Sequence, residues 1–155
     1  MEALASEAKR LEGVGILSAE EVAVLDFKSL AAFWQSELGL KIRAHAGKVH
    51  RELAFTARFS LKALAEVTGK APDAALAEEF VVVQGVADLA VVLETEIWLV
   101  DFKTDDVGRN GLDAKVKTYE PQLRLYASAL ARIYRRPVMN RWLYFLSVGQ
   151  AVPVG

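Results

Sequence analysis

The chain has 155 residues, 53% hydrophobic and 25% charged, which suits one folded domain and excludes intrinsic disorder. It has no cysteine, which excludes disulfides and Cys-ligated zinc and favours a cytoplasmic setting. No apolar run reaches the roughly 20 residues that span a bilayer. Residues 1–106 carry 11 Lys/Arg against 18 Asp/Glu, and residues 107–155 carry 8 against 2. The basic C-terminal third suits either a polyanion partner or a solvated helix face.

Helical patterns fill the N-terminal part of the chain. Residues 2–12 are good helix formers, and S-A-E-E from Ser18 is a capping box that predicts a short helix over residues 19–25. From residue 29, helical spacing gives one apolar face, and a further short helix is expected to reach about residue 46. We therefore expect a helical segment over residues 1–47, with an apolar face formed by Leu30, Phe33, Trp34 and Leu38.

The periodicity changes at Val49. Strands are predicted over residues 49–60, 80–93 and 96–103, with a bend or bulge at Gly85, and the last two should form an antiparallel hairpin. Residues 61–79 are expected to be a loop with some helical character.

The remaining elements follow a polar loop at residues 104–111. A helical pattern covers residues 112–134, but Pro121 suits a helix start, so the helix proper is expected to begin near residue 120. A fourth strand at 141–147 and an edge piece at 151–154 complete an α/β or α+β fold, with a mixed sheet of about four to five strands flanked by helices.

Two aspartates stand near the ends of apolar strands in the predicted hairpin. The short connection lets Asp88 and Asp101 reach the same end of the sheet. Burying two carboxylates is costly unless something neutralises them. Mg²⁺ suits this position because it takes oxygen ligands and is usually held by one or two carboxylates. A Mg²⁺ ion held by Asp88 and Asp101 is therefore one way to neutralise both carboxylates, and the backbone carbonyl of Phe102 could be a third ligand.

Lys103 lies two residues after Asp101, so both side chains leave the same face of the strand. A bound metal acidifies water and stabilises charge on a scissile phosphate, and a nearby ammonium can orient that water. The alternative for such a D-x-K sequence is a surface ion pair. Gln122 and Tyr126, at i and i+4 of the predicted helix, share a face, and alone they would be a surface glutamine and a core tyrosine.

The ordered set Q-G-V-A-D, W-L-V-D-F-K-T and Y-E-P-Q-L-R-L-Y resembles the nuclease domain of AddA/RecB-type helicase–nucleases, in the PD-(D/E)XK superfamily. V-H-R-E-L-A-F and W-L-Y-F-L-S help to extend the resemblance over nearly the whole chain. It implies a single domain over residues 1–155 with a restriction-endonuclease-like core at 48–155. The implied activity is a metal-dependent DNA exonuclease in double-strand-break processing and recombinational repair. The implied partners are single-stranded DNA, a helicase motor on the same or another chain, and a second helicase–nuclease subunit, with no membrane.

The resemblance also implies roles for individual residues. Asp88, Asp101 and Lys103 would be catalytic, with Mg²⁺ or Mn²⁺ held by both aspartates and the Phe102 carbonyl. Gln122 and Tyr126 match an element that positions the site and the DNA.

Glu52 matches a glutamate on the family's first strand, with an ion pair across the sheet as the alternative. The family usually has proline where this chain has Ala54.

The larger departure is an upstream histidine that completes the family's metal site. His45 and His50 stand in no such element, and the chain has no P-loop. We therefore expect a fragment or minimal form that begins after that histidine, with metal affinity lower by about 1–3 kcal/mol.

Two alternatives remain open. One is a catalytically weakened module for DNA binding or subunit docking, with phosphate contacts from the basic C-terminal third: Lys115, Lys117, Arg124, Arg132, Arg135, Arg136 and Arg141. The other is a domain unrelated to nucleic acid, in which the Asp and Lys residues form a structural ion-pair cluster.

Overall fold

A computed structural model describes residues 1–69, 79–108 and 111–155. The chain divides into two compact units, Met1–Ala44 and His45–Gly155. The helical segment predicted from the sequence ends at residue 47, three residues after the end of the first unit at Ala44. The organisation of residues 1–155 as a single nuclease domain stays a prediction.

The first unit is helical, as predicted. It contains α1 (Glu2–Gly13), α2 (Ala19–Ala23), α3 (Phe27–Gln35) and α4 (Glu37–Ala44). The capping box is confirmed, because Ser18 Oγ accepts a 3.1 Å hydrogen bond from Glu21 N–H while the Glu21 carboxylate accepts one of 2.8 Å from Ser18 N–H.

The predicted apolar face of the first unit is divided between α3 and α4. Ser36 ends α3, and its hydroxyl donates to the Phe33 carbonyl at 2.6 Å and accepts from Gly39 N–H at 3.1 Å. A Cβ on Gly39 would lie 2.1 Å from the Phe33 carbonyl oxygen, so only glycine allows this close turn.

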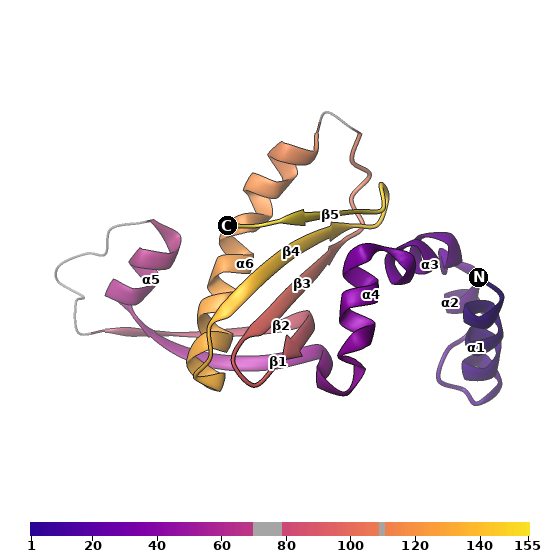
Figure 1. Cartoon of the computed structure of the whole chain (residues 1–155), viewed down its shortest axis with the longest axis horizontal. Coiled ribbons are helices and arrows are strands. Elements are labelled where there is room, and N and C mark those ends of the chain that lie inside the picture. Colours follow the sequence, from indigo (N-terminus) through magenta and orange to yellow (C-terminus); the bar gives the residue numbers. More distant parts are fainter. Residues whose placement is uncertain (70–78, 109–110) are drawn as a thin grey trace. The chain divides into compact units, whose positions relative to one another are not determined.

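The second unit is built on a five-stranded mixed sheet in the order β1-β2-β3-β4-β5 (Figure 1). A short 3₁₀ turn, η1 (Ala46–Lys48), leads into β1. All neighbouring strands are antiparallel except β3 and β4, which are parallel and joined through α6 (Leu112–Tyr134). The strands are β1 (Val49–Ser60), β2 (Phe80–Val92), β3 (Ile97–Lys103), β4 (Val138–Phe145) and β5 (Gln150–Pro153). This arrangement confirms the predicted fold class and the β2–β3 hairpin.

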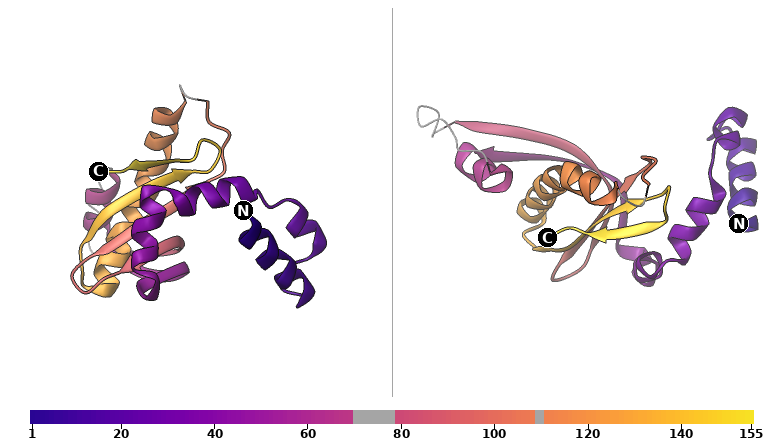
Figure 2. Two further views of the ribbon diagram at one scale, coloured as in Figure 1. Left: turned by 45° about the vertical axis from the view of Figure 1, so that its right-hand side comes forward. Right: turned by 90° about the horizontal axis from the view of Figure 1, so that it is seen from above.

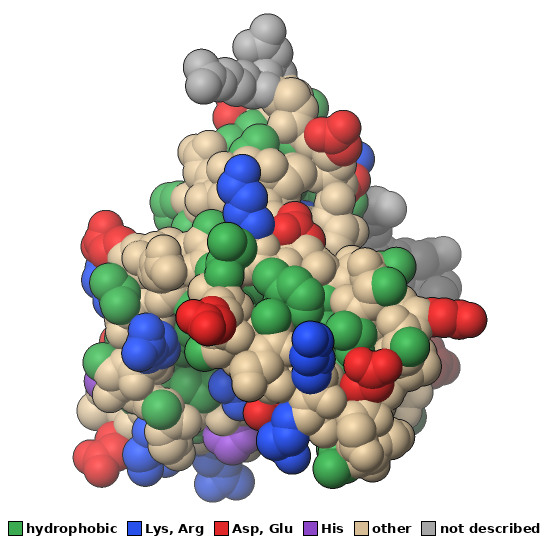
Figure 3. All heavy atoms as spheres, turned by 90° about the vertical axis from the view of Figure 1, so that its right-hand side faces the viewer, with side chains coloured by type: hydrophobic (Ala, Val, Ile, Leu, Met, Phe, Trp, Pro, Cys, Tyr) green, Lys and Arg blue, Asp and Glu red, His purple; other side chains and the backbone are tan. Residues whose placement is uncertain are grey.

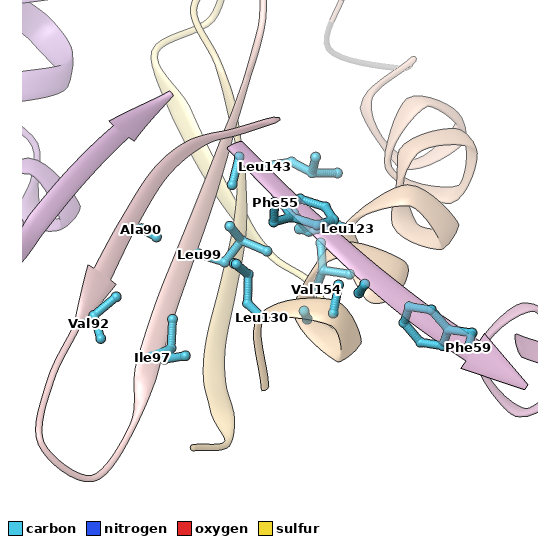
Figure 4. Close-up of a cluster of buried hydrophobic side chains, with 14 of the residues drawn as sticks. Phe55, Phe59, Ala90, Val92, Ile97, Leu99, Leu123, Leu130, Leu143 and Val154 are labelled. Atoms are coloured by element: carbon cyan, nitrogen blue, oxygen red, sulfur yellow. The ribbon is translucent and has the colours of Figure 1, made fainter. Parts of the chain in front are cut away.

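Helix α6 covers one face of this sheet and supplies much of the core. In the views of Figure 2, α6 lies on one side of the sheet. It is the crossover that joins the parallel strands β3 and β4. Leu123 and Leu130 of α6 are fully buried and pack in one cluster with Leu99 of β3, Leu143 of β4 and Phe55 of β1 (Figure 4). This packing holds α6 against one face of the sheet.

One local expectation is wrong, and another is wrong in part. Helix α6 begins at Leu112 rather than near residue 120, and Pro121 lies inside it. Proline removes one backbone hydrogen bond there, a cost of about 3 kcal/mol, which the core packing of α6 offsets. Strand β2 runs through Gly85 without a bulge, because its pairing with β1 keeps one register on both sides of Phe55↔Gly85.

The predicted loops are described in part. In the loop predicted over residues 61–79, Leu61–Thr68 form helix α5. This helix is capped by Ser60 Oγ, which accepts a hydrogen bond from Ala63 N–H at 3.2 Å. Residues 70–78 of that loop, and 109–110 of the loop at 104–111, lie outside the described residues. In the described part of the chain, no helix combines the length and apolar character needed to cross a bilayer.

Candidate active site

Asp101 is the one polar residue of the described core that is buried, with 5% of its surface exposed. It lies on β3, with apolar residues before it that hold the strand in the centre of the sheet. Lys103 leaves the same face of β3, and its Nζ lies 2.7 Å from Asp101 Oδ2. Phe102 points to the other face, where it meets the Tyr144 ring at 6.0 Å between centroids. Strand alternation therefore places the carboxylate and the ammonium together, as predicted.

Asp88 joins this site from β2. The β2–β3 ladder ends at the pair Leu89↔Val100, one position before Asp88 and Asp101 would face each other. There, Asp88 Oδ2 accepts a 2.8 Å hydrogen bond from the backbone N–H of Phe102. The Asp88 side chain thus takes the place of a ladder bond at the point where the strands separate.

The charge state of Asp101 reflects these surroundings. Burial raises the pKa of its carboxyl group above the ordinary aspartate value, the Lys103 ammonium opposes this rise, and the Asp88 carboxylate adds to it. Two carboxylates and one ammonium leave a net negative charge in a poorly solvated place. Such a site gains from a bound cation.

Gln122 and Tyr126 lie together on α6, as their spacing predicts. Gln122 Nε2 donates to Tyr126 Oη at 3.2 Å, and the Tyr126 ring packs edge-on against Phe55 at 4.9 Å between centroids. A Cβ on Gly85 would lie 2.9 Å from Tyr126 Cζ and 2.7 Å from Phe55 Cζ. Gly85 is therefore needed for the close approach of both rings, three residues before Asp88.

Glu52 has an unusual backbone on β1. Its φ is +47°, which is uncommon for a non-glycine residue. The neighbouring pairs Arg51↔Leu89 and Leu53↔Ala87 put it opposite Asp88, but Glu52 itself drops out of the ladder. Its side chain is exposed, and it forms no ion pair with any described residue. The ion pair across the sheet is thus not formed within the described residues.

The carboxylates of Asp88 and Asp101 provide part of the ligand set that a hard divalent cation needs. Asp88 and Asp101 provide two carboxylates, which is the number that commonly holds Mg²⁺, with water and substrate phosphate completing the coordination. Within residues 1–69, 79–108 and 111–155, no group of three or more His, Cys, Asp or Glu side chains could hold a metal. His45 packs edge-on against Trp98 at 5.1 Å between centroids.

The contacts that Tyr119 makes with Lys103 and Asp105 were not predicted from the sequence. The centroid of the Tyr119 ring lies 4.0 Å from Lys103 Nζ, and the Tyr119 hydroxyl donates to Asp105 Oδ2 at 2.8 Å. In the sequence, Tyr119 is only one of the apolar residues at helical spacing, and no pattern joins it to Asp105.

Comparisons with known proteins agree with the fold. Residues 3–151 match the family described as the PD-(D/E)XK nuclease superfamily. An ATP-dependent helicase/nuclease subunit of Carboxydothermus hydrogenoformans is 33% identical over 151 residues, which are 97% of this chain and 12% of that protein. The protein of the same name from Bacillus licheniformis is 33% identical over 150 residues, 92% of this chain and 12% of that protein. The chain thus spans a small part of these relatives, and through its matched residues and its mixed sheet it belongs to the PD-(D/E)XK nuclease superfamily.

Proposed function

We propose that this chain is the metal-dependent DNA nuclease domain of a helicase–nuclease, and that it hydrolyses phosphodiester bonds. The observation that carries the proposal is the meeting of Asp88, Asp101 and Lys103 at one end of the β2–β3 hairpin, with Asp101 buried beside the ammonium. Superfamily membership supports the reaction class.

The residues would share the work as follows. Asp88, Asp101 and the Phe102 carbonyl would hold Mg²⁺ or Mn²⁺, which supplies an acidified water and neutralises charge on the scissile phosphate. Lys103 would orient the attacking water and offset the charge that develops on the phosphate. Gln122 and Tyr126 would position the DNA strand along α6, and Glu52 would act from the facing strand.

The cellular role is a further part of the proposal. The relatives are named as subunits of an ATP-dependent helicase/nuclease, and the chain covers 12% of two of them. We infer that the domain acts on single-stranded DNA delivered by a helicase motor, as an exonuclease with a second helicase–nuclease subunit. It would serve double-strand-break processing and recombinational repair in the cytoplasm.

Cleavage of end-labelled single-stranded DNA in Mg²⁺ or Mn²⁺ tests the activity. The parent should cut, EDTA should abolish cutting, and Asp101→Asn and Lys103→Met should each lower the rate by about 10² or more. Asp113→Asn on the exposed first turn of α6 is a matched charge control and should cut like the parent. Equal cutting by parent, Asp101→Asn and Lys103→Met would assign the activity to a contaminant.

A second candidate function is a DNA-binding or docking module with weakened catalysis. The observation in its favour is that only two carboxylates gather at the site among the described residues. Several of the expected phosphate-binding cations are, however, engaged within the chain. Lys115 pairs with Asp105, Arg124 pairs with Glu120, and Arg136 donates to the Leu93 carbonyl.

The second candidate depends on cations at the surface. On the one face drawn in Figure 3, Lys and Arg side chains are interspersed with Asp and Glu side chains. DNA affinity that falls steeply with salt, without cleavage, would favour this candidate.

The third alternative is a purely structural ion-pair cluster. The match of residues 3–151 to a nuclease superfamily favours the first candidate over this one.

A further inference from the structure

The Lys103 ammonium is held between two different surfaces. One is the Asp101 carboxylate at 2.7 Å, and the other is the face of the Tyr119 ring, 4.0 Å from Nζ to the ring centroid. Only 14% of the Lys103 side chain is exposed. A lysine stem is long and flexible, so an ammonium needs a second contact to keep one position. Here the aromatic face provides that contact from α6.

The Tyr119 ring is itself fixed through Asp105. Its hydroxyl donates to Asp105 Oδ2 at 2.8 Å, and Lys115 Nζ lies 2.5 Å from Asp105 Oδ1. Lys115 and Tyr119 are four residues apart and so share a face of α6. The Asp105 carbonyl also accepts from Ser147 Oγ at 2.7 Å. Asp105 therefore joins the segment after β3, the turn after β4 and α6 at one point.

We propose that Tyr119 is a positioning residue for Lys103, through the face of its ring. This rests on the proposed nuclease function. The ring face attracts the ammonium electrostatically but carries no formal charge. It therefore steadies Lys103 without neutralising it as a second carboxylate would. The N–H groups of Lys103 that Asp101 does not occupy stay available to the water or the phosphate.

The proposal separates the ring of Tyr119 from its hydroxyl. Tyr119→Phe keeps the aromatic face and loses only the bond to Asp105, whereas Tyr119→Leu removes the face. We expect Tyr119→Leu to lower kcat on single-stranded DNA by about tenfold with KM nearly unchanged, and Tyr119→Phe to stay within about threefold of the parent. Tyr134→Leu, a half-buried tyrosine later in α6, is the matched control for a general effect on the helix.

Proton NMR of Lys103 provides a readout that does not depend on cleavage. Ring current from Tyr119 should move the Lys103 ε-methylene signals upfield, with assignment from their loss in Lys103→Met. The shift should persist in Tyr119→Phe and disappear in Tyr119→Leu. If Tyr119→Leu does not fold by circular dichroism, Tyr119→Met removes the ring while filling its space.

Three results would overturn the proposal: full kcat in Tyr119→Leu, an equal loss in Tyr119→Phe and Tyr119→Leu, or no upfield Lys103 signal in the parent. A parent that cuts no DNA but shows the ring-current shift would refute the nuclease function and leave the contact between Lys103 and Tyr119 standing.

Discussion

The Asp88 carboxylate accepts a 2.8 Å hydrogen bond from the backbone N–H of Phe102, across the point where the β2–β3 ladder ends. This bond fixes the Asp88 side chain beside Asp101 and its neighbour Lys103. It also gives Asp88 a structural role separate from its charge, and substitutions can divide the two.

Asp88→Asn should keep an acceptor for Phe102 N–H, whereas Asp88→Ala leaves that group without one. We expect Asp88→Ala to lower the free energy of unfolding by about 1–3 kcal/mol without metal, and Asp88→Asn to lower it by less than about 1 kcal/mol. Urea unfolding in EDTA measures both. Equal losses in the two variants would show that the hydrogen bond does not stabilise the fold.

Asp101→Asn should raise the metal-free stability at neutral pH, because burial makes the ionised carboxylate unfavourable in the folded chain. Because the folded pKa of Asp101 is raised, its ionised form costs stability above that pKa. The difference in the free energy of unfolding between variant and parent should therefore disappear as the pH falls through the folded pKa toward the unfolded pKa of about 4. A pH series of unfolding curves tests this, and a gap that widens in acid would contradict it.

The pH dependence at Asp105 should have the opposite sign. The Lys115 ammonium and the Tyr119 hydroxyl lower the pKa of Asp105. Its contribution to stability is thus present above the ordinary aspartate pKa of about 4 and is lost as the pH falls through the lower folded value. Asp105→Asn should therefore destabilise the chain at pH 7. The free energy of unfolding of this variant should also depend less steeply on pH between about pH 5 and 2. If the free energy of unfolding changes with pH in the variant as it does in the parent, the proposed role of Asp105 is wrong.

Gly85→Ala should disturb the site through Tyr126. The added Cβ would lie 2.7 Å from Phe55 Cζ and 2.9 Å from Tyr126 Cζ, so one ring has to move. We expect a loss of about 1–3 kcal/mol in stability and weaker DNA cleavage. Gly47→Ala is the control, because nothing lies within 4 Å of its added Cβ and its φ is not positive. A Gly85→Ala variant as stable as Gly47→Ala would show that the rings are not tightly packed.

Much of the fold follows from local patterns in the sequence. The capping box at Ser18, the alternation from Val49 and the apolar runs on either side of residues 94–96 each correspond to an observed element. The start predicted for α6 is wrong because the preference of Pro121 for the first turn of a helix is only a local one. The packing of Leu123 and Leu130 in the core is a tertiary effect that the proline does not signal.

The candidate site could be predicted only as far as its residues are close in sequence. Alternation places Asp101 and Lys103 on one face, and helical spacing joins Gln122 to Tyr126. The contact between Lys103 and Tyr119 depends on how α6 crosses the sheet, which no spacing reveals. The positive φ of Glu52 is likewise absent from any residue pattern.

The central claim is that Asp88 and Asp101 together hold one divalent cation, and Mn²⁺ titration followed by electron paramagnetic resonance tests it most directly. The account predicts one Mn²⁺ per chain, with affinity lowered by about tenfold or more in Asp88→Asn and in Asp101→Asn, and unchanged in Asp113→Asn. Binding of Mn²⁺ by both site variants with the affinity of the parent would contradict it.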